Sequence, residues 1–217
     1  MMATTPVGQN SPRSPDRVAA CLAGGFVVLL LATEAVLSLP DERANAASVA
    51  TFYVAHRTFT IILQILGFAA SALLGGYAWR LRRVDHVVST AGMIMAVCSL
   101  LPGLVTLVTA VVADPVNPAA ASRWNRLEPR ADDVLFVGII VFAAAVALRL
   151  GRSLPALGVL ALLVAVGCFF RLGLEAAGVG RGSLDAIVPL SFLILIAVMA
   201  ALSLLGVLGP GARHKPS

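Results

Sequence analysis

The chain has 217 residues, of which 59% are hydrophobic and 12% are charged, and its formal net charge is +5. Because so few charges cannot cover a soluble domain of this size, the composition indicates a membrane protein. The basic residues form short clusters at the ends of apolar runs rather than one polar surface, which argues against a protein that binds nucleic acid.

Six apolar runs are near or above the roughly 20 residues that cross a bilayer as a helix. They are Val18–Leu39, Phe59–Trp79, Val87–Ala113, Val134–Leu150, Leu154–Leu174 and Ala186–Leu208. The predicted fold class is therefore all-α, a polytopic membrane helix bundle with six transmembrane helices within residues 18–209. A disordered cytoplasmic tail at 1–17 and a short cytoplasmic tail at 210–217 would flank it.

The first span ends at Pro40, and the small residues Ala44, Asn45 and Ala46 that follow resemble a signal-peptidase site. Cleavage there is an alternative to a retained helix. The run is about 22 residues long and contains Glu34, whereas the core of a signal peptide usually has about 7–15 uncharged residues. We therefore expect the first span to be retained.

The second span has one face of polar and small side chains. At a helical spacing of fours and threes, this face collects Tyr53, Arg57, Thr60, Gln64, Gly67, Ser71 and Gly75. Since small residues let helices approach closely in hydrocarbon, Gly67, Ser71 and Gly75 are predicted to form a helix-packing contact. No Pro or Gly interrupts the chain before Gly67, so one continuous helix is expected from about Ala44 into this span.

The third span contains Pro102, which predicts a kink because proline removes a backbone hydrogen bond. The following segment, Asp114–Asp133, contains three prolines and is predicted to be the longest external loop. Its carboxylates lack the spacing of a calcium loop, so no metal site is predicted. Asp132 and Asp133 are expected to cap the fourth span.

A tight hairpin is predicted between the fourth and fifth spans, with Pro155 in the first turn of the fifth. The segment Arg149–Leu160 reads Arg-Leu-Gly-Arg-Ser-Leu-Pro-Ala-Leu-Gly-Val-Leu. It resembles a family of uncharacterised bacterial multi-span integral membrane proteins of unknown function. The resemblance implies the membrane-bundle architecture and carries no activity.

The distribution of basic residues predicts the orientation in the membrane. Counting ends and loops alternately places nine basic residues on one side and seven on the other. By the positive-inside rule, both termini are predicted to be cytoplasmic. Fifteen of the sixteen basic residues are Arg, which suggests a high-GC bacterial genome. The expected location is thus a bacterial cell membrane, crossed several times.

Several polar residues are expected at one depth on the outer side of the membrane. They are Glu34, His56, Arg57, Gln64, Arg171 and Glu175. An unpaired charge within a span costs about 2.5–3.5 kcal/mol on insertion scales, so these residues are predicted to meet as a cluster. An ion pair between Glu34 and Arg171 is expected, with Gln64 beside it. Alternatively, Arg171 pairs with Glu175 and extends toward the headgroups.

The sequence contains no pattern typical of catalysis or of cofactor binding. Cys21, Cys98 and Cys168 lack metal-ligand spacing. The first hypothesis is therefore a non-enzymatic structural or regulatory protein that packs in the lipid bilayer against another membrane protein or a second copy of itself. The second is a small-solute or proton-coupled transporter that uses the polar cluster. The third is an intramembrane enzyme using Glu34 and His56.

Overall fold

Nine helices form the part of the chain that the computed structural model describes, namely residues 15–34, 36, 39–41, 44–179 and 184–208. In chain order they are α1 (Arg17–Glu34), α2 (Ala46–Ala55), α3 (Arg57–Leu81), α4 (His86–Cys98), α5 (Leu100–Val112), α6 (Ala119–Asn125), α7 (Glu128–Leu150), α8 (Pro155–Ala176) and α9 (Leu184–Leu204). No strand occurs among these residues, so the predicted all-α fold class is confirmed.

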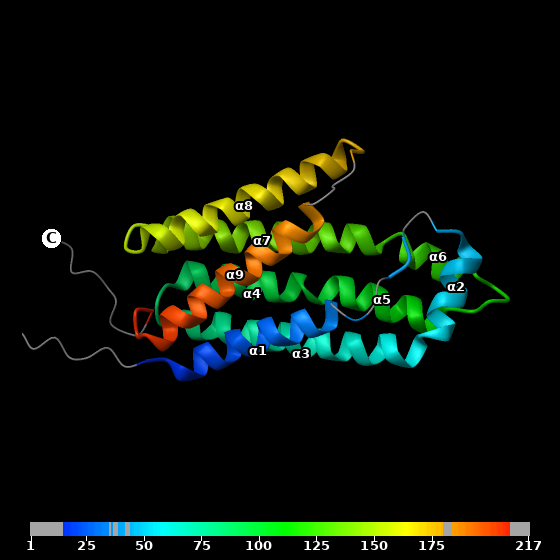
Figure 1. Ribbon diagram of the computed structural model, residues 1–217, viewed down its shortest axis with the longest axis horizontal. Helices are drawn as coiled ribbons and strands as arrows, with labels where there is room; N and C mark the ends of the chain where they lie inside the picture. Colours follow the sequence, from blue (N-terminus) through cyan, green and yellow to red (C-terminus); the bar gives the residue numbers. More distant parts are fainter. Residues whose placement is uncertain (1–14, 35, 37–38, 42–43, 180–183, 209–217) are drawn as a thin grey trace, which may run out of the picture.

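Five segments within the described residues are helical, long and apolar enough to cross a bilayer. They are α3, α4 with α5, α6 with α7, α8 and α9. The predicted membrane helix bundle is confirmed, and the predicted six spans are close to this count. The remaining long helix, α1, has 18 residues and therefore a length of about 27 Å. It lies alongside α3 (Figure 1).

The longer helices pack side by side, and the short helices α2 and α6 lie together at one end of the bundle (Figure 1). α3 contacts α1, α4 and α5, while α7 lies between α4 and α8. α9 crosses from α8 to α1. The main core forms where these helices meet, around fully buried Tyr77, Met95, Phe142 and Leu195.

The described ends of the chain lie at the same end of the bundle, opposite α2 and α6. The backbone nitrogen of Asp16 donates a hydrogen bond to the carbonyl oxygen of Ser203 at 3.0 Å. The Asp16 carboxylate also accepts from the Ala19 nitrogen at 3.0 Å and from Arg80 Nη2 at 2.8 Å. Asp16 and Arg17 thus belong to the fold, and the prediction of a disordered tail is wrong for these two residues.

Asp16→Asn is expected to destabilise the protein at neutral pH and to have little effect in acid. Burial raises the pKa of Asp16, but the hydrogen bonds from Arg80 and Ala19 and the charges of Arg80 and Arg83 lower it further, so the pKa lies below its ordinary 3.8. A depressed carboxyl pKa stabilises the fold above the unfolded pKa, and this stabilisation is lost as the pH falls through the folded value. Thermal unfolding of both proteins from pH 7 to pH 3 would test this; a difference in stability independent of pH would contradict it.

The helix predicted to run without interruption from about Ala44 into the second span is divided at His56. α2 ends at Ala55 and α3 begins at Arg57, and between them His56 has φ −111° and ψ 15°. The prediction is wrong because the local sequence does not show what α2 packs against. The face of α2 that contains Tyr53 is buried against alanines of α5 and α6, and this apolar burial favours the bend over a straight helix.

The predicted kink in the third span is confirmed, and it lies between α4 and α5 at Ser99. The ring of Pro102 clashes with a helical carbonyl four residues earlier, which belongs to Cys98, the last residue of α4. Ser99 Oγ lies 2.8 Å from both the Ser71 Oγ and the carbonyl oxygen of Ala96. The break is therefore held by polar contacts with α3 and α4.

The predicted loop Asp114–Asp133 contains the helix α6 and the first turns of α7. α7 begins at Glu128, and Pro129 fits its first turn because the nitrogen of that position needs no helical partner. Asp132 and Asp133 therefore lie inside α7. The prediction that they cap the fourth span is wrong.

The predicted packing face on α3 is in contact with α4 over part of its length. Ser71 is buried and contacts Ser99, and a Cβ on Gly75 would lie 3.7 Å from the Cβ of Ala96. Apart from Gly67, its chain neighbours and the adjacent backbone of α3, no described atom lies within 4 Å of the position of a Cβ on Gly67. The prediction of a close helix contact is thus wrong for Gly67, because no neighbouring helix comes close to this position among the described residues.

Candidate functional site: the Arg171 cluster

The guanidinium of Arg171 is the most deeply buried charged group among the described residues, with 3% of the side chain exposed. It extends from α8 toward α7, where its Cζ lies 3.7 Å from the centre of the Phe136 ring. It also reaches α9, where Nε donates to Asp185 Oδ1 at 3.1 Å. One side chain therefore links three helices.

Four carboxylates surround this guanidinium. The distances from Arg171 nitrogens are 3.1 Å to Asp185, 3.6 Å to Asp133, 3.8 Å to Glu175 and 3.9 Å to Asp132. Asp132 and Asp133 come from α7, Glu175 from α8 and Asp185 from α9. We call Arg171 and these four acids the Arg171 cluster.

The contacts within the cluster differ in kind. Asp185 accepts a direct hydrogen bond, whereas the 3.6 Å between Arg171 Nη1 and Asp133 Oδ1 exceeds the usual hydrogen-bond range. Both of these atoms are buried without a hydrogen-bond partner. The contact between Arg171 and Asp133 is thus ionic, and the guanidinium also contacts α7 through the cation–π contact to Phe136.

The structure brings together two of the six residues predicted to form an outer polar cluster. Arg171 and Glu175 form an ion pair four residues apart, as one of the alternatives predicted. Arg171 does not extend toward the exterior, because its side chain is buried between α7, α8 and α9. The side chain of Glu34 lies outside the described residues, so its predicted pairing with Arg171 stays a prediction.

The other predicted members lie on α3 and at its start, away from α8. Arg57 Nη2 donates to the carbonyl oxygen of Ala113 at the end of α5. His56 is exposed, and its Nδ1 lies 3.0 Å from the carbonyl oxygen of Phe52. Gln64 lies on α3, which packs against α1, α4 and α5. The prediction that these three join Arg171 is wrong, because similar depth in the membrane does not place residues on adjoining helix faces.

Sequence reasoning missed Asp132, Asp133 and Asp185 as the partners of Arg171. Asp132 and Asp133 were interpreted as helix caps. The sequence did not show that both lie inside α7, about one turn from its start. The available signal was the requirement that a cation within a span have partners. Asp132 and Asp133 lie in the first two turns of α7 and Asp185 in the first turn of α9, whereas Arg171 lies in the last two turns of α8.

A second polar contact closes the end of the bundle between α2 and α6. The Tyr53 hydroxyl donates to Asn125 Oδ1 at 3.4 Å, and Asn125 Nδ2 donates to the carbonyl oxygen of Asp41 at 3.3 Å. Burial and the nearby charge of Glu128 raise the pKa of Tyr53 above its usual value. The phenol therefore stays protonated and acts as a hydrogen-bond donor that joins α2 to α6.

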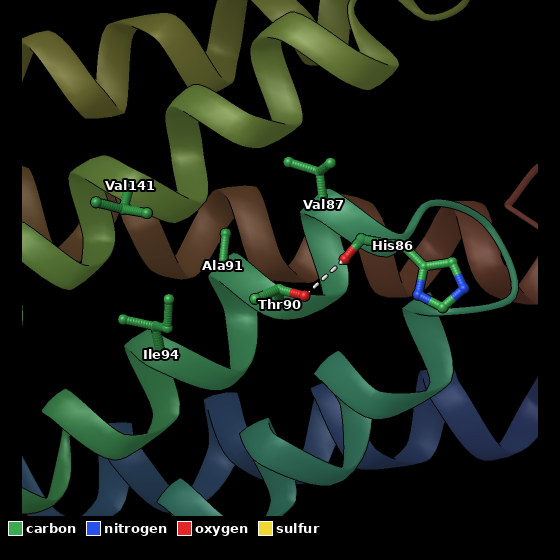
Figure 2. A pocket seen from close by; sticks show the side chains of 6 residues that line it. All are labelled: His86, Val87, Thr90, Ala91, Ile94 and Val141. Carbon is green, nitrogen blue, oxygen red and sulfur yellow. Dashed lines mark hydrogen bonds between the residues drawn. The ribbon is translucent and has the colours of Figure 1, made fainter.

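Two surface hollows of the described structure lie apart from the Arg171 cluster, and Ser71 is among the residues that line the smaller one. The larger of two surface hollows has a volume of about 380 Å³ and lies between α4 and α7 (Figure 2). The smaller, about 200 Å³, lies between α3 and α4. Both are lined mainly by apolar side chains. Within the described residues, no group of three His, Cys, Asp or Glu side chains could hold a metal ion.

Comparisons with known proteins add no assignment. No family model, curated protein or solved structure matches this chain. The resemblance of Arg149–Leu160 to a family of multi-span membrane proteins therefore rests on those residues alone, and the proposals below rest on the geometry of the chain.

Proposed function

We propose that this protein is a structural or regulatory component of a bacterial cell membrane that acts by packing against another membrane protein or a second copy of itself. The observation that carries the proposal is where the polar side chains lie. Those of the Arg171 cluster, and those of the Asp16–Arg80 and Ser71–Ser99 contacts, join one helix of the bundle to another. Polar side chains that bind one another between helices stabilise the bundle, which is the property expected of a structural component.

The position of the hollows supports the same proposal. A carrier typically binds its substrate near the midplane, between broken helices, in a site with polar groups. Here the side-chain hydroxyl of Ser99, at the helix break, is already hydrogen-bonded to Ser71 and to the carbonyl oxygen of Ala96. The smaller hollow lies beside this break, and both hollows are open at the surface and lined mainly by apolar side chains.

The test is the composition of the protein after extraction in a mild detergent. A stable complex of defined stoichiometry, containing either a second copy or another membrane protein, is expected by native mass spectrometry. A monomer at every detergent and protein concentration tested, with no protein partner found by crosslinking in intact membranes, would contradict the proposal.

A second candidate, proton-coupled or cation-coupled transport, is favoured by one observation. Arg171 is outnumbered by acidic neighbours among the described residues, and its contact to Asp133 lacks a direct hydrogen bond. Carboxylates around a buried cation occur in proton relays. Proteoliposomes with a pH-sensitive dye inside distinguish the two candidates: proton uptake that Asp133→Asn abolishes would support transport, and its absence would support the structural function.

The proposed orientation places both termini in the cytoplasm. Arg82, Arg83, Arg149 and Arg152 lie at the end of the bundle that holds the described chain ends, where the described acids are Asp16 and Asp85. Both of these acids are paired with arginines. The opposite end carries most of the described carboxylates. This asymmetry supports the positive-inside assignment.

Cysteine labelling tests this orientation. In a background in which Cys21, Cys98 and Cys168 are replaced by Ala, Val116→Cys lies between α5 and α6, where Val116 is 91% exposed. Arg152→Cys lies in the exposed turn between α7 and α8. A membrane-impermeant maleimide is expected to label position 116 in intact cells and position 152 after permeabilisation. The reverse pattern would invert the topology.

A further inference from the structure

The larger hollow is a groove between α4 and α7 on the surface of the bundle (Figure 2). Its lining residues are His86, Val87, Thr90, Ala91 and Ile94 from α4 and Val141 from α7. Buried Ala91 forms its floor, and the half-exposed side chains of Val87, Ile94 and Val141 rise beside it. The groove is thus a mainly apolar depression that is open to the surroundings of the bundle.

The groove lies within two of the segments that are long and apolar enough to cross a membrane. Its surroundings in a bilayer are therefore acyl chains. From His86 to Ile94 the groove runs along about two turns of α4, or roughly 12 Å. This is less than half of the roughly 30 Å thickness of the hydrocarbon core. The groove thus matches the length of part of one acyl chain rather than that of a membrane-spanning helix.

The mouth of the groove is polar and basic. Arg149 lies two turns beyond Val141 on α7, and its Nε donates to Asp85 Oδ2 at 3.0 Å, next to His86. Its side chain is 54% exposed, and a guanidinium carries further donors on its two η nitrogens. Arg152 is exposed in the turn that follows α7. A phosphate at this end of the groove would lie near Arg149, which contacts the residue next to His86. Arg152 is only three residues further along the chain.

We propose that the groove binds one acyl chain of an anionic phospholipid, whose phosphate lies against Arg149 at the end of the groove near His86. The apolar walls contact the chain, and the guanidinium selects the charge of the headgroup. This inference does not depend on the proposed function. It assigns the membrane-facing surface of α4 and α7 to a lipid, so a protein partner would bind on another surface.

The test uses native mass spectrometry of the full chain in detergent, with phosphatidylglycerol or phosphatidylcholine of identical acyl chains added. The wild type is expected to retain phosphatidylglycerol in preference. Because one basic residue near a membrane surface contributes about 1 kcal/mol of attraction, Arg149→Gln is expected to reduce this retention about fivefold. Val141→Trp fills the groove and is expected to abolish the retention of either lipid.

Three matched variants separate binding from folding. Asp85→Asn keeps a residue that caps helices well and leaves Arg149 without its anionic neighbour, so retention of phosphatidylglycerol is expected to rise. Val137→Trp places the same bulk one turn away on α7, and Arg130→Gln removes an arginine from the other end of that helix; both are expected to bind as the wild type does. Melting temperatures establish that each variant is folded.

Four results would overturn the assignment. Equal retention of the two lipids, or unchanged retention in Arg149→Gln, would show that Arg149 does not select an anionic headgroup. Retention of phosphatidylglycerol by folded Val141→Trp and by folded Ile94→Trp would remove the role of the groove. A dimer that either Trp variant dissociates would show that a second copy of the chain, and not a lipid, occupies the groove.

Discussion

Gly92→Leu is expected to lower the melting temperature in detergent by about 2–12 °C, as overpacking that costs about 1–3 kcal/mol does in a protein of this size. Gly92 lies on α4 where this helix crosses α3 and α7. A Cβ at this position would stand 2.8 Å from the Cβ of Ala78 and 3.2 Å from Cε2 of Phe142. The Ala78 atom is fixed to the α3 backbone, so a side chain at position 92 has to move α3 away from α4.

Gly67→Leu is the matched control, because Gly67 also lies within a membrane-spanning helix but has no described atom near the position of a Cβ. Its melting temperature is expected to change by about 2 °C or less. Thermal unfolding in the same detergent measures both variants. Equal effects of the two substitutions would show that the distance between α3 and α4 is not set by Gly92.

The sequence was sufficient to predict the features that depend on local composition. Apolar runs predicted the membrane bundle, and Pro102 predicted the break between α4 and α5, because the loss of a helical hydrogen bond is a property of the residue itself. Pro155 likewise begins α8, as predicted. These predictions needed no knowledge of neighbouring helices.

Predictions that depended on which helices adjoin were less successful. A stripe of small residues on α3 predicted close packing at Gly67, but a tight approach between α3 and α4 is at Ala78, opposite Gly92. The apolar faces of a membrane helix look alike in sequence whether they meet lipid or protein, because both surroundings are hydrocarbon. Periodicity alone therefore does not distinguish these two faces.

The candidate site shows the same limit. Arg171 was identified from the sequence because a cation inside a span needs partners, and its contact with Glu175 follows from their spacing. Its partners Asp133 and Asp185 come from two other helices. Their identity depends on α7 and α9 lying beside α8, which no local pattern records.

The same three-helix arrangement predicts a large effect for Arg171→Gln. Removing one partner of a buried ion pair leaves the other charges uncompensated and typically costs about 3–5 kcal/mol. In a chain of this length the melting temperature should fall by about 10 °C or more. Arg149→Gln is the matched control, because Arg149 also pairs with an aspartate but is largely exposed. Exposed pairs contribute about 1 kcal/mol or less, so its melting temperature should change by about 2 °C.

A second substitution distinguishes charge from packing. If the loss in Arg171→Gln comes from uncompensated carboxylates, adding Asp133→Asn removes one of them and should restore part of the stability, although Asp133→Asn alone destabilises the wild type. Such a positive interaction energy is expected for residues in one ionic network. If the loss comes instead from the contact of the guanidinium with Phe136, the two substitutions should add. Additive effects, or an Arg171→Gln variant as stable as Arg149→Gln, would contradict the assignment of Arg171 as the ionic link between α7, α8 and α9.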